Sequence, residues 1–307
     1  MHPSSAIALN IFGPYTKNFE DLVKTRLFIK HGDYDAASKL FDGKLKEYLT
    51  DKAKAKSLSG ALKIAINSVY GLTAARFDNK LRDPRNVDNI VAKRGALFMI
   101  DLKEEVQKRG YTVAHIKTDS IKIPEADEKI IKFVTEFGKK YGYTFEHEAT
   151  YDRICLVNDA VYIAKDSKDG HWTATGTQFQ VPYVFKTLFS KEDILFKDKC
   201  ETKTTTSAFY LDMNENLNEN EHDYQFIGKT GSFCPIKSGC GGGLLMRLQG
   251  DKYYAATGTK GYRWLESETV KNLNKESDID EGYYRRLVDD AIDTISKYGD
   301  VEQFIYG

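Results

Sequence analysis

The 307-residue sequence has few cysteines and no long apolar stretch. The four cysteines, Cys155, Cys200, Cys234 and Cys240, are scattered, and the interval between the last two is not the C-x₂-C spacing of a zinc knuckle. We therefore expect reduced structural thiols. No segment approaches the roughly 20 apolar residues of a membrane span, and the N-terminus has no basic-then-apolar signal pattern. These absences predict a soluble, intracellular protein without a membrane partner.

The chain as a whole has no net charge, but its two parts carry charges of opposite sign. Residues 1–122 hold 22 Lys and Arg against 14 Asp and Glu, a balance of +8, and residues 123–307 hold 23 against 31, a balance of −8. A cationic surface on the first part would suit phosphates. An ordinary charged helical surface would give the same balance, so charge alone does not decide.

The length is sufficient for a substantial core and two domains. The first part predicts three helices, at residues 18–31, 33–49 and 51–72. Asn18 is the expected N-cap of the first helix and Gly32 its stop. The first and third helices are expected to form a helical hairpin rich in Lys and Arg.

The next segment mixes helices and strands. Pro84 breaks the chain, and a long helix is expected over 86–109. Two strands, at 111–116 and 121–123, follow and are joined by Lys117–Ser120. The remaining elements are a helix at 125–141 and short strands at 145–147, 154–157 and 161–164. This order predicts an α+β layer with helices on one face of the sheet.

The C-terminal part has no internal repeat. We expect a solvated acidic loop at 212–224 and an amphipathic helix at 281–297. The glycine-dense stretch 228–243 contains two segments that superficially resemble phosphate-binding motifs. Gly228-Lys229-Thr230 fails as a P-loop because Asp223 replaces the required glycine, and Ser238–Gly243 reads more simply as a flexible turn.

The candidate chemistry lies on the third helix and in the turn after Lys117. Spacings of seven, four and three place Lys56, Lys63, Asn67 and Tyr70 on one helix face. A Lys ammonium suits a triphosphate, a Tyr ring offers a flat surface to a base pair, and Arg26 on the opposing helix could bind another phosphate oxygen. The alternatives are solvated surface for the cations and core packing for Tyr70.

Asp119 lies where the two predicted strands meet. A carboxylate there suits Mg²⁺, which commonly takes one or two carboxylates together with substrate phosphates. On its own, a turn aspartate more often hydrogen-bonds its own backbone.

These residues resemble the motifs of family-B DNA polymerases. Lys63 to Gly71 matches the fingers motif K-x₃-N-S-x-Y-G, and Thr118-Asp119-Ser120 matches the end of the palm motif D-T-D-S. Met1-His2-Pro3-Ser4 resembles the tail of D-x-x-S-L-Y-P-S, and Arg26 stands where the family's fingers arginine would fall. Tyr162 resembles the tyrosine of K-K-R-Y. The likeness is greatest to bacteriophage members, from residue 1 to about 190, and the C-terminal glycine-rich part carries less specific motifs.

The resemblance implies a role for each matched residue. Asp119 would be a catalytic ligand of one of two Mg²⁺ ions, and Arg26 and Lys63 would hold the triphosphate. The implied nucleotide-binding residues are Arg26, Lys63, Asn67, Tyr70, His2 and Ser4, with His2 at the position that discriminates against ribose. The implied DNA-binding residues are Ser68, Gly71, Thr118, Ser120 and Tyr162. The implied partners are primer–template DNA and dNTPs, in the bacterial host cytoplasm if the protein is phage-encoded.

The implied fold is α+β, a right-hand polymerase palm of antiparallel sheet and helices, with helical-hairpin fingers and a thumb-like C-terminal region. Residues 1–16 would end the first palm motif, 17–75 form the fingers, 76–165 the palm and 166–307 the thumb and C-terminal region.

Four departures from the family pattern bear on activity. Lys117 replaces the first Asp of D-T-D-S, and the Lys-Lys of K-K-R-Y is absent. The Asp of D-x-x-S-L-Y-P-S would fall four residues before Met1, and the proofreading exonuclease region is missing. We therefore expect the C-terminal part of a polymerase, from a truncated frame, a split gene or a shifted start, which needs an N-terminal polymerase segment as partner.

Three functions follow from these motifs. The first is template-directed addition of dNTPs to a primer 3′-OH by two-metal phosphoryl transfer in viral DNA replication, with little activity from this chain alone. The second is a non-catalytic half of a split polymerase that binds DNA or a partner chain. The third is an RNA-copying polymerase, which His2 at the sugar position leaves open.

Overall fold

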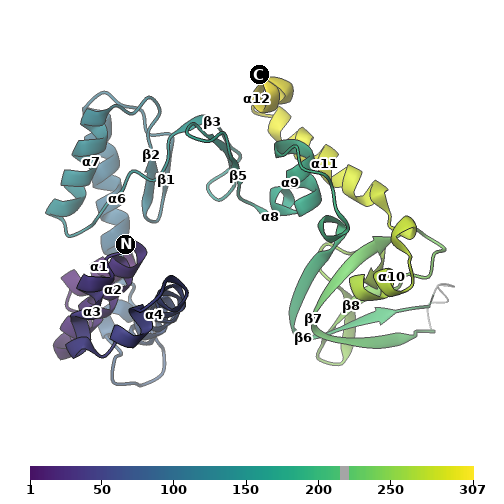
Figure 1. Ribbon diagram of the computed structural model, residues 1–307, viewed down its shortest axis with the longest axis horizontal. Coiled ribbons are helices and arrows are strands. Elements are labelled where there is room, and N and C mark those ends of the chain that lie inside the picture. The colour runs from purple at the N-terminus through teal and green to yellow at the C-terminus, as the bar shows by residue number, and fades with distance from the viewer. Residues whose placement is uncertain (215–220) are drawn as a thin grey trace. The chain divides into compact units, whose positions relative to one another are not determined.

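The computed structural model describes residues 1–214 and 221–307 and contains two compact units, Met1–Glu148 and Ala149–Gly307 (Figure 1). The fold is α+β with antiparallel sheets. Residues 215–220 of the acidic loop expected at 212–224 lie outside the described residues. No helix in the described part of the chain is long and apolar enough to cross a bilayer.

The first unit is mainly helical. Its elements, in chain order, are α1 (His2–Ala8), η1 (Gly13–Tyr15), α2 (Thr16–Lys30), α3 (Tyr34–Ser38), η2 (Leu40–Gly43), η3 (Lys46–Leu49), α4 (Lys52–Thr73), α5 (Pro84–Val87), α6 (Ile90–Lys108), β1 (His115–Lys117), β2 (Ser120–Lys122) and α7 (Glu128–Lys140).

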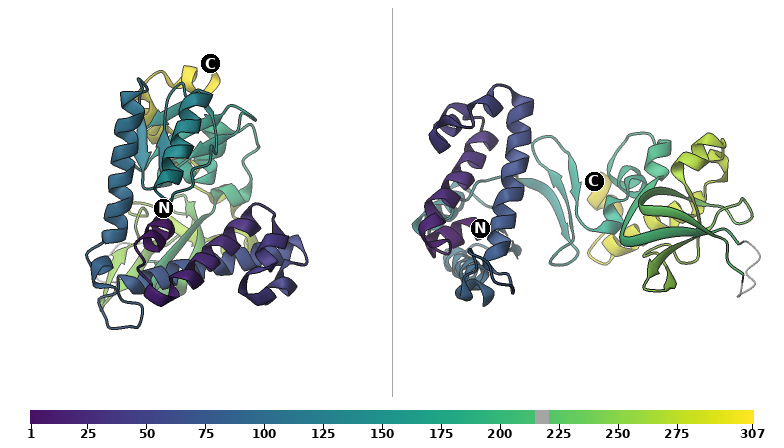
Figure 2. Two further views of the ribbon diagram at one scale, coloured as in Figure 1. Left: turned by 90° about the vertical axis from the view of Figure 1, so that its left-hand side faces the viewer. Right: turned by 90° about the horizontal axis from the view of Figure 1, so that it is seen from below.

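The expected helical hairpin is confirmed as α2 packed against α4 (Figure 2). Phe19, near the start of α2, shares a core cluster with Ile66, near the end of α4. Ile29, at the other end of α2, shares a second cluster with Leu62 and residues earlier in α4. The two helices therefore run antiparallel. Asp51 caps α4 by accepting a hydrogen bond from the Lys54 N–H at 2.8 Å.

Several expected boundaries in this unit are wrong. Tyr15, not Asn18, precedes the first turn of α2. The single helix expected at 33–49 is three short pieces, because Phe41 and Asp42 have φ angles of 51° and 55°, which interrupt the helical hydrogen-bond ladder. The helix expected at 86–109 is divided in the same way at Asn89, where φ is 61°.

The hairpin of β1 and β2 is confirmed, with Ile116 opposite Ile121 and Thr118-Asp119 forming the turn. Helices α6 and α7 pack on it through one cluster, so helices cover one face as expected. The first strand is shorter than predicted, and the strand expected at 145–147 is absent. Phe145 instead packs its ring 5.9 Å from that of Phe98, which accounts for the apolar signal.

The second unit contains two antiparallel sheets flanked by helices. Its elements, in chain order, are β3 (Tyr151–Leu156), β4 (Tyr162–Asp166), β5 (Trp172–Ala174), α8 (Thr177–Gln180), α9 (Pro182–Phe189), η4 (Phe196–Lys199), β6 (Glu201–Asp212), β7 (Tyr224–Ile236), β8 (Leu244–Gln249), β9 (Lys252–Ala255), β10 (Arg263–Glu266), α10 (Ser267–Asn272), η5 (Glu276–Asp278), α11 (Glu281–Ser296) and α12 (Val301–Tyr306).

The larger sheet has the order β10-β7-β6-β8-β9, and the smaller sheet has the order β3-β4-β5. Trp264, Phe233 and Tyr284 are fully buried in the core of the larger sheet. The predicted last helix is confirmed as α11, which buries Val288, Ala291 and Ile295 against the smaller sheet and α9.

The glycine-dense stretch is in part a strand. Gly228 and Gly231 lie in β7, and the turn expected near Ser238 follows it, with the Cys240 N–H bonded to the Lys237 carbonyl. A Cβ at Gly231 would lie 2.5 Å from the Phe233 ring. The glycine is therefore required by the close approach of that ring, and phosphate binding is not needed to explain it.

Candidate functional site

Two predicted site residues of the first unit, His2 and Tyr70, are in contact, and the charge of a third, Asp119, acts on His2. His2 begins α1, Tyr70 lies near the end of α4, and Asp119 lies in the β1–β2 turn. The rings of His2 and Tyr70 pack edge to face, with centroids 5.5 Å apart and planes at 73°. Burial lowers the pKa of His2, the Met1 ammonium lowers it further, and the Asp119 carboxylate opposes both. Asp119 is therefore within electrostatic reach of His2.

A buried polar network holds α1 on α6. The Arg94 Nη1 donates to the Tyr143 Oη at 2.6 Å, and the Tyr143 Oη lies 2.7 Å from the Ser5 Oγ. A Cβ at Gly95 would lie 3.0 Å from the Met1 Sδ, so a side chain there would require the Met1 side chain to shift. A charge-assisted network of this kind fixes the position of α1 and with it that of His2.

A second buried network fixes the end of α4. The Thr73 Oγ1 donates to the Tyr70 carbonyl at 2.7 Å, and the Asn86 Nδ2 donates to the Thr73 Oγ1 at 2.6 Å. Burial raises the pKa of the Tyr70 phenol, and a hydrogen bond with the Asn86 side chain opposes the shift. Thr73 and Asn86 were not predicted from the sequence, because no periodicity marks a buried amide that follows Pro84 and Arg85.

The predicted cations lie on neighbouring helices. Lys63 and Asn67 are exposed on α4, as is Lys56 two turns earlier. Arg26 is half-buried on α2, between Leu22 and Ile29, two residues that pack toward α4. The Arg26 Nε is enclosed and has no acceptor among the described residues. A hydrogen bond to this unpaired N–H would lower the free energy of the protein. Rotation of the Arg26 side chain could bring the N–H to an acceptor such as a phosphate oxygen.

The other predicted residues occupy three places. Ser4 is half-buried in α1, while Ser68 and Gly71 are exposed on α4. Thr118 is exposed and Ser120 half-buried on either side of Asp119. Tyr162 belongs to the second unit, where it begins β4 opposite Leu156. Among the predicted residues of the first unit, the structure therefore brings His2 and Tyr70 into contact.

The residues present suit one divalent ion better than two. Asp119 supplies one exposed carboxylate, and no group of three or more His, Cys, Asp or Glu side chains that could hold a metal occurs in residues 1–214 or 221–307. Burial lowers the pKa of the nearby Lys122, and the charge of Lys117 lowers it further. One carboxylate is enough for Mg²⁺ that is also bound by nucleotide phosphates. A two-ion site needs further carboxylates.

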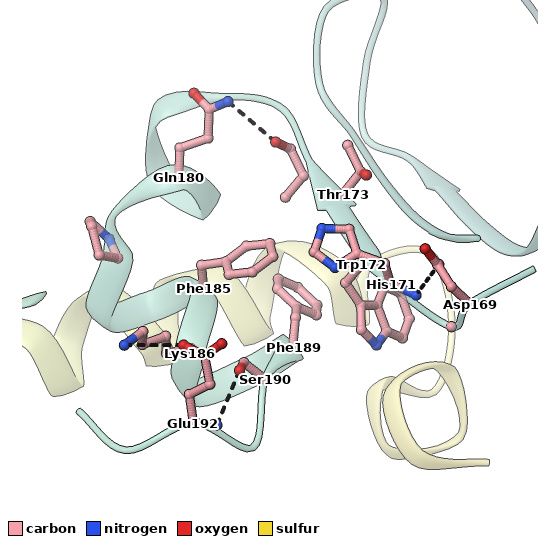
Figure 3. Close-up of a pocket in the computed structure, with 13 residues that line it drawn as sticks. Asp169, His171, Trp172, Thr173, Gln180, Phe185, Lys186, Phe189, Ser190 and Glu192 are labelled. Atoms are coloured by element: carbon pink, nitrogen blue, oxygen red, sulfur yellow. Dashed lines mark hydrogen bonds and ion pairs between the residues drawn. The ribbon is translucent and has the colours of Figure 1, made fainter. Parts of the chain in front are cut away.

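A separate hollow of about 980 Å³ lies in the second unit, between β5 and α9 (Figure 3). Trp172 and Phe189 form part of its wall, with ring centroids 5.2 Å apart. Lys186 lines it as well, but its Nζ is already paired with Asp198 at 2.8 Å and Glu192 at 3.3 Å. None of the residues predicted from the sequence lines this hollow.

Comparisons with known proteins give limited information. No protein-family model matches the chain, and no curated protein matches it. Among solved structures it is similar to the family B DNA polymerase from the hyperthermophilic archaeon Pyrobaculum calidifontis, with a TM-score of 0.46 and 14% sequence identity. The match covers 92% of this chain and 38% of that one, so the chain spans well under half of that polymerase. A score at this level does not establish a shared fold.

Proposed function

We propose that the chain is the palm, fingers and thumb-like part of a family-B DNA polymerase of bacteriophage type, which binds primer–template DNA and dNTPs. The observation that supports this most is the contact between the His2 and Tyr70 rings, together with the action of the Asp119 charge on His2. These residues come from the three segments that resemble the family's motifs.

In this proposal each residue has a defined task. The Tyr70 ring contacts the nascent base pair, and His2, packed against its edge, lies beneath the sugar. Arg26 and Lys63 bind the triphosphate, while Asp119 holds Mg²⁺ together with the phosphates. The primer 3′-OH attacks the α-phosphorus in line and pyrophosphate leaves. A bound Mg²⁺ would stabilise the charge that develops on the phosphate oxygens.

The second candidate function is a non-catalytic one, in which the chain binds DNA or a partner but adds no nucleotides by itself. The single carboxylate at the β1–β2 turn favours it. Extension would then require an N-terminal polymerase segment carrying the exonuclease and the first palm aspartate.

Sugar selectivity is a separate question, because in this proposal His2 lies at the position that contacts the sugar. Comparison of dNTP with rNTP incorporation by the complemented protein distinguishes a polymerase that makes DNA from one that makes RNA.

DNA binding is the first test. We expect the chain to bind primer–template with an affinity that falls at least about tenfold between roughly 50 and 200 mM salt, because several phosphate contacts release counterions. The +8 balance of residues 1–122 motivates this expectation. Fluorescence anisotropy with a labelled primer–template measures it. Affinity independent of salt, or no binding at the lower concentration, would contradict a nucleic-acid function.

Nucleotide binding tests the assignment of the cations. We expect Arg26→Met and Lys63→Met each to weaken dNTP binding by about 10- to 100-fold, because each loses a charge-assisted hydrogen bond to the triphosphate. Primer–template affinity should change by less than about threefold. The measurement is a dNTP titration of the binary complex, using the complemented protein if the chain alone gives no signal.

Lys24→Met is the matched control. Lys24 lies on the same helix as Arg26, is exposed, and is paired with Glu20 at 2.7 Å. It should leave dNTP binding unchanged. Equal losses of DNA and dNTP affinity in the Arg26 and Lys63 variants would mean that these residues contact DNA rather than the incoming nucleotide.

A further inference from the structure

Two of the four cysteines lie side by side in the second unit. The Cys200 and Cys234 sulfur atoms are 3.5 Å apart. Cys200 immediately precedes β6 and Cys234 lies in β7, and the adjoining residues Glu201 and Phe233 are paired in the antiparallel register. The two cysteines therefore lie one position beyond the Glu201–Phe233 pair, on neighbouring strands, although they are 34 residues apart in sequence.

The backbone at this place suits a covalent link. Residues opposite each other on antiparallel strands have Cα atoms about 4.5–5.5 Å apart. That interval lies within the roughly 4.4–6.8 Å spanned by disulfides, whose sulfur atoms are about 2.05 Å apart. Rotation of the side chains alone would therefore close the gap. We propose that Cys200 and Cys234 form an oxidisable pair that becomes a cross-strand disulfide by exchange with a low-molecular-weight disulfide.

The two thiols differ in accessibility, which sets the order of the steps. Cys200 is half-buried and Cys234 is buried. The Cys200 thiolate attacks the small disulfide first, forms a mixed disulfide and releases one small thiol. The Cys234 thiolate then attacks the Cys200 sulfur and releases the second small thiol. The two protein thiols lose two protons and two electrons, and the small disulfide takes up these protons and electrons to become two small thiols.

The surroundings make this reaction slow. Burial raises the pKa of both thiols, and the charge of Glu276 adds to the shift at each. At Cys200, hydrogen bonds with Cys234 and Ser267 oppose part of the rise in pKa. The thiolate is the reactive form, so few molecules react at neutral pH and more react as the pH rises. The pair therefore responds to sustained oxidation and not to a brief exposure.

The link would join two parts of the second unit. Cys200 ends the η4 segment, where its thiol donates to the Phe196 carbonyl at 3.2 Å and the neighbouring Lys199 carbonyl accepts from the Tyr284 hydroxyl at 2.7 Å. A disulfide would tie the η4 segment to strand β7 and close a loop of 34 residues. Closing such a loop should raise the thermal midpoint of the second unit by roughly 5–10 °C.

The experiment uses the full chain incubated with glutathione disulfide over about a day at two pH values. We expect free thiols to fall from four to two, peptide mapping to show Cys200 joined to Cys234, and the rate to rise with pH. Cys234→Ser should trap one glutathione on Cys200, because the second thiol is missing. Cys240→Ser, the matched control, should form the same disulfide as the unaltered chain.

Two results would overturn the proposal. One is a folded chain in which Cys240 reacts while Cys200 and Cys234 both stay reduced. The other is a stable glutathione adduct on Cys200 in the unaltered chain, since an adjacent Cys234 should displace it.

Discussion

Replacing Asp119 with asparagine is expected to lower Mg²⁺-dependent primer extension by at least about a hundredfold, while primer–template binding stays within about twofold. The carboxylate is the donor that the β1–β2 turn offers to a metal, and an amide oxygen without charge binds Mg²⁺ far more weakly. Loss of a metal that stabilises the transition state costs several kcal/mol, and each 1.4 kcal/mol is about tenfold in rate.

The measurement is primer extension with Mg²⁺, run on the chain alone and on the chain supplied with an upstream polymerase segment that carries the first palm aspartate. Asp101→Asn is the matched control, since it removes an exposed carboxylate from α6 in the same unit. Full activity in the complemented Asp119→Asn protein would rule out the metal assignment. Robust extension by the uncomplemented chain would show that no upstream carboxylate is needed.

Replacing Trp264 with alanine is expected to destabilise the second unit by about 3–5 kcal/mol, because a large fully buried side chain leaves a cavity. For a unit of this size the thermal midpoint should fall by roughly 10 °C. The loss of stability should act on the second unit, since the buried cluster that contains Trp264 is made of residues of that unit alone. Salt-sensitive DNA binding by residues of the first unit should therefore persist.

Tryptophan fluorescence is the appropriate measurement. Both tryptophans of the chain, Trp172 and Trp264, lie in the second unit, so Trp172 still reports on that unit in the variant. Tyr254→Ala is the control on the same sheet, because Tyr254 is 46% exposed and its loss should cost less than about 1 kcal/mol. A midpoint that shifts equally in both variants would mean that the Trp264 cluster is not the core of this unit.

Two elements of the first unit, α4 and the β1–β2 hairpin, were predicted correctly because their residues carry strong local signals. The α4 helix has an aspartate cap and apolar residues at helical spacing, and the β1–β2 hairpin has apolar residues on both sides of a turn. The broken helix at 33–49 was missed because Phe41 and Asp42 have left-handed backbone angles. Phenylalanine rarely adopts such angles, so its position in the sequence does not indicate a break.

The larger sheet of the second unit was not predicted, for a different reason. Strands β6 and β7 are rich in threonine, serine and glycine, and their apolar residues come together only when distant segments pair. The same limit applies to the candidate site. The motifs identified His2, Tyr70 and Asp119, but the buried supports Thr73, Asn86 and Tyr143 act through tertiary contacts that leave no periodic pattern.

The β1–β2 hairpin is a sheet of two strands in the described part of the chain, and each strand has three residues. An isolated two-stranded hairpin is marginally stable in water, so this one depends on the side chains that α6 and α7 pack against Ile116 and Ile121. Opening of the turn then costs less free energy than unfolding of the whole unit. A ligand bound by Asp119 only in the closed hairpin would stabilise that state by a free energy that grows with the logarithm of its concentration divided by its dissociation constant. Ordering of the turn and occupancy of the site are therefore one coupled equilibrium.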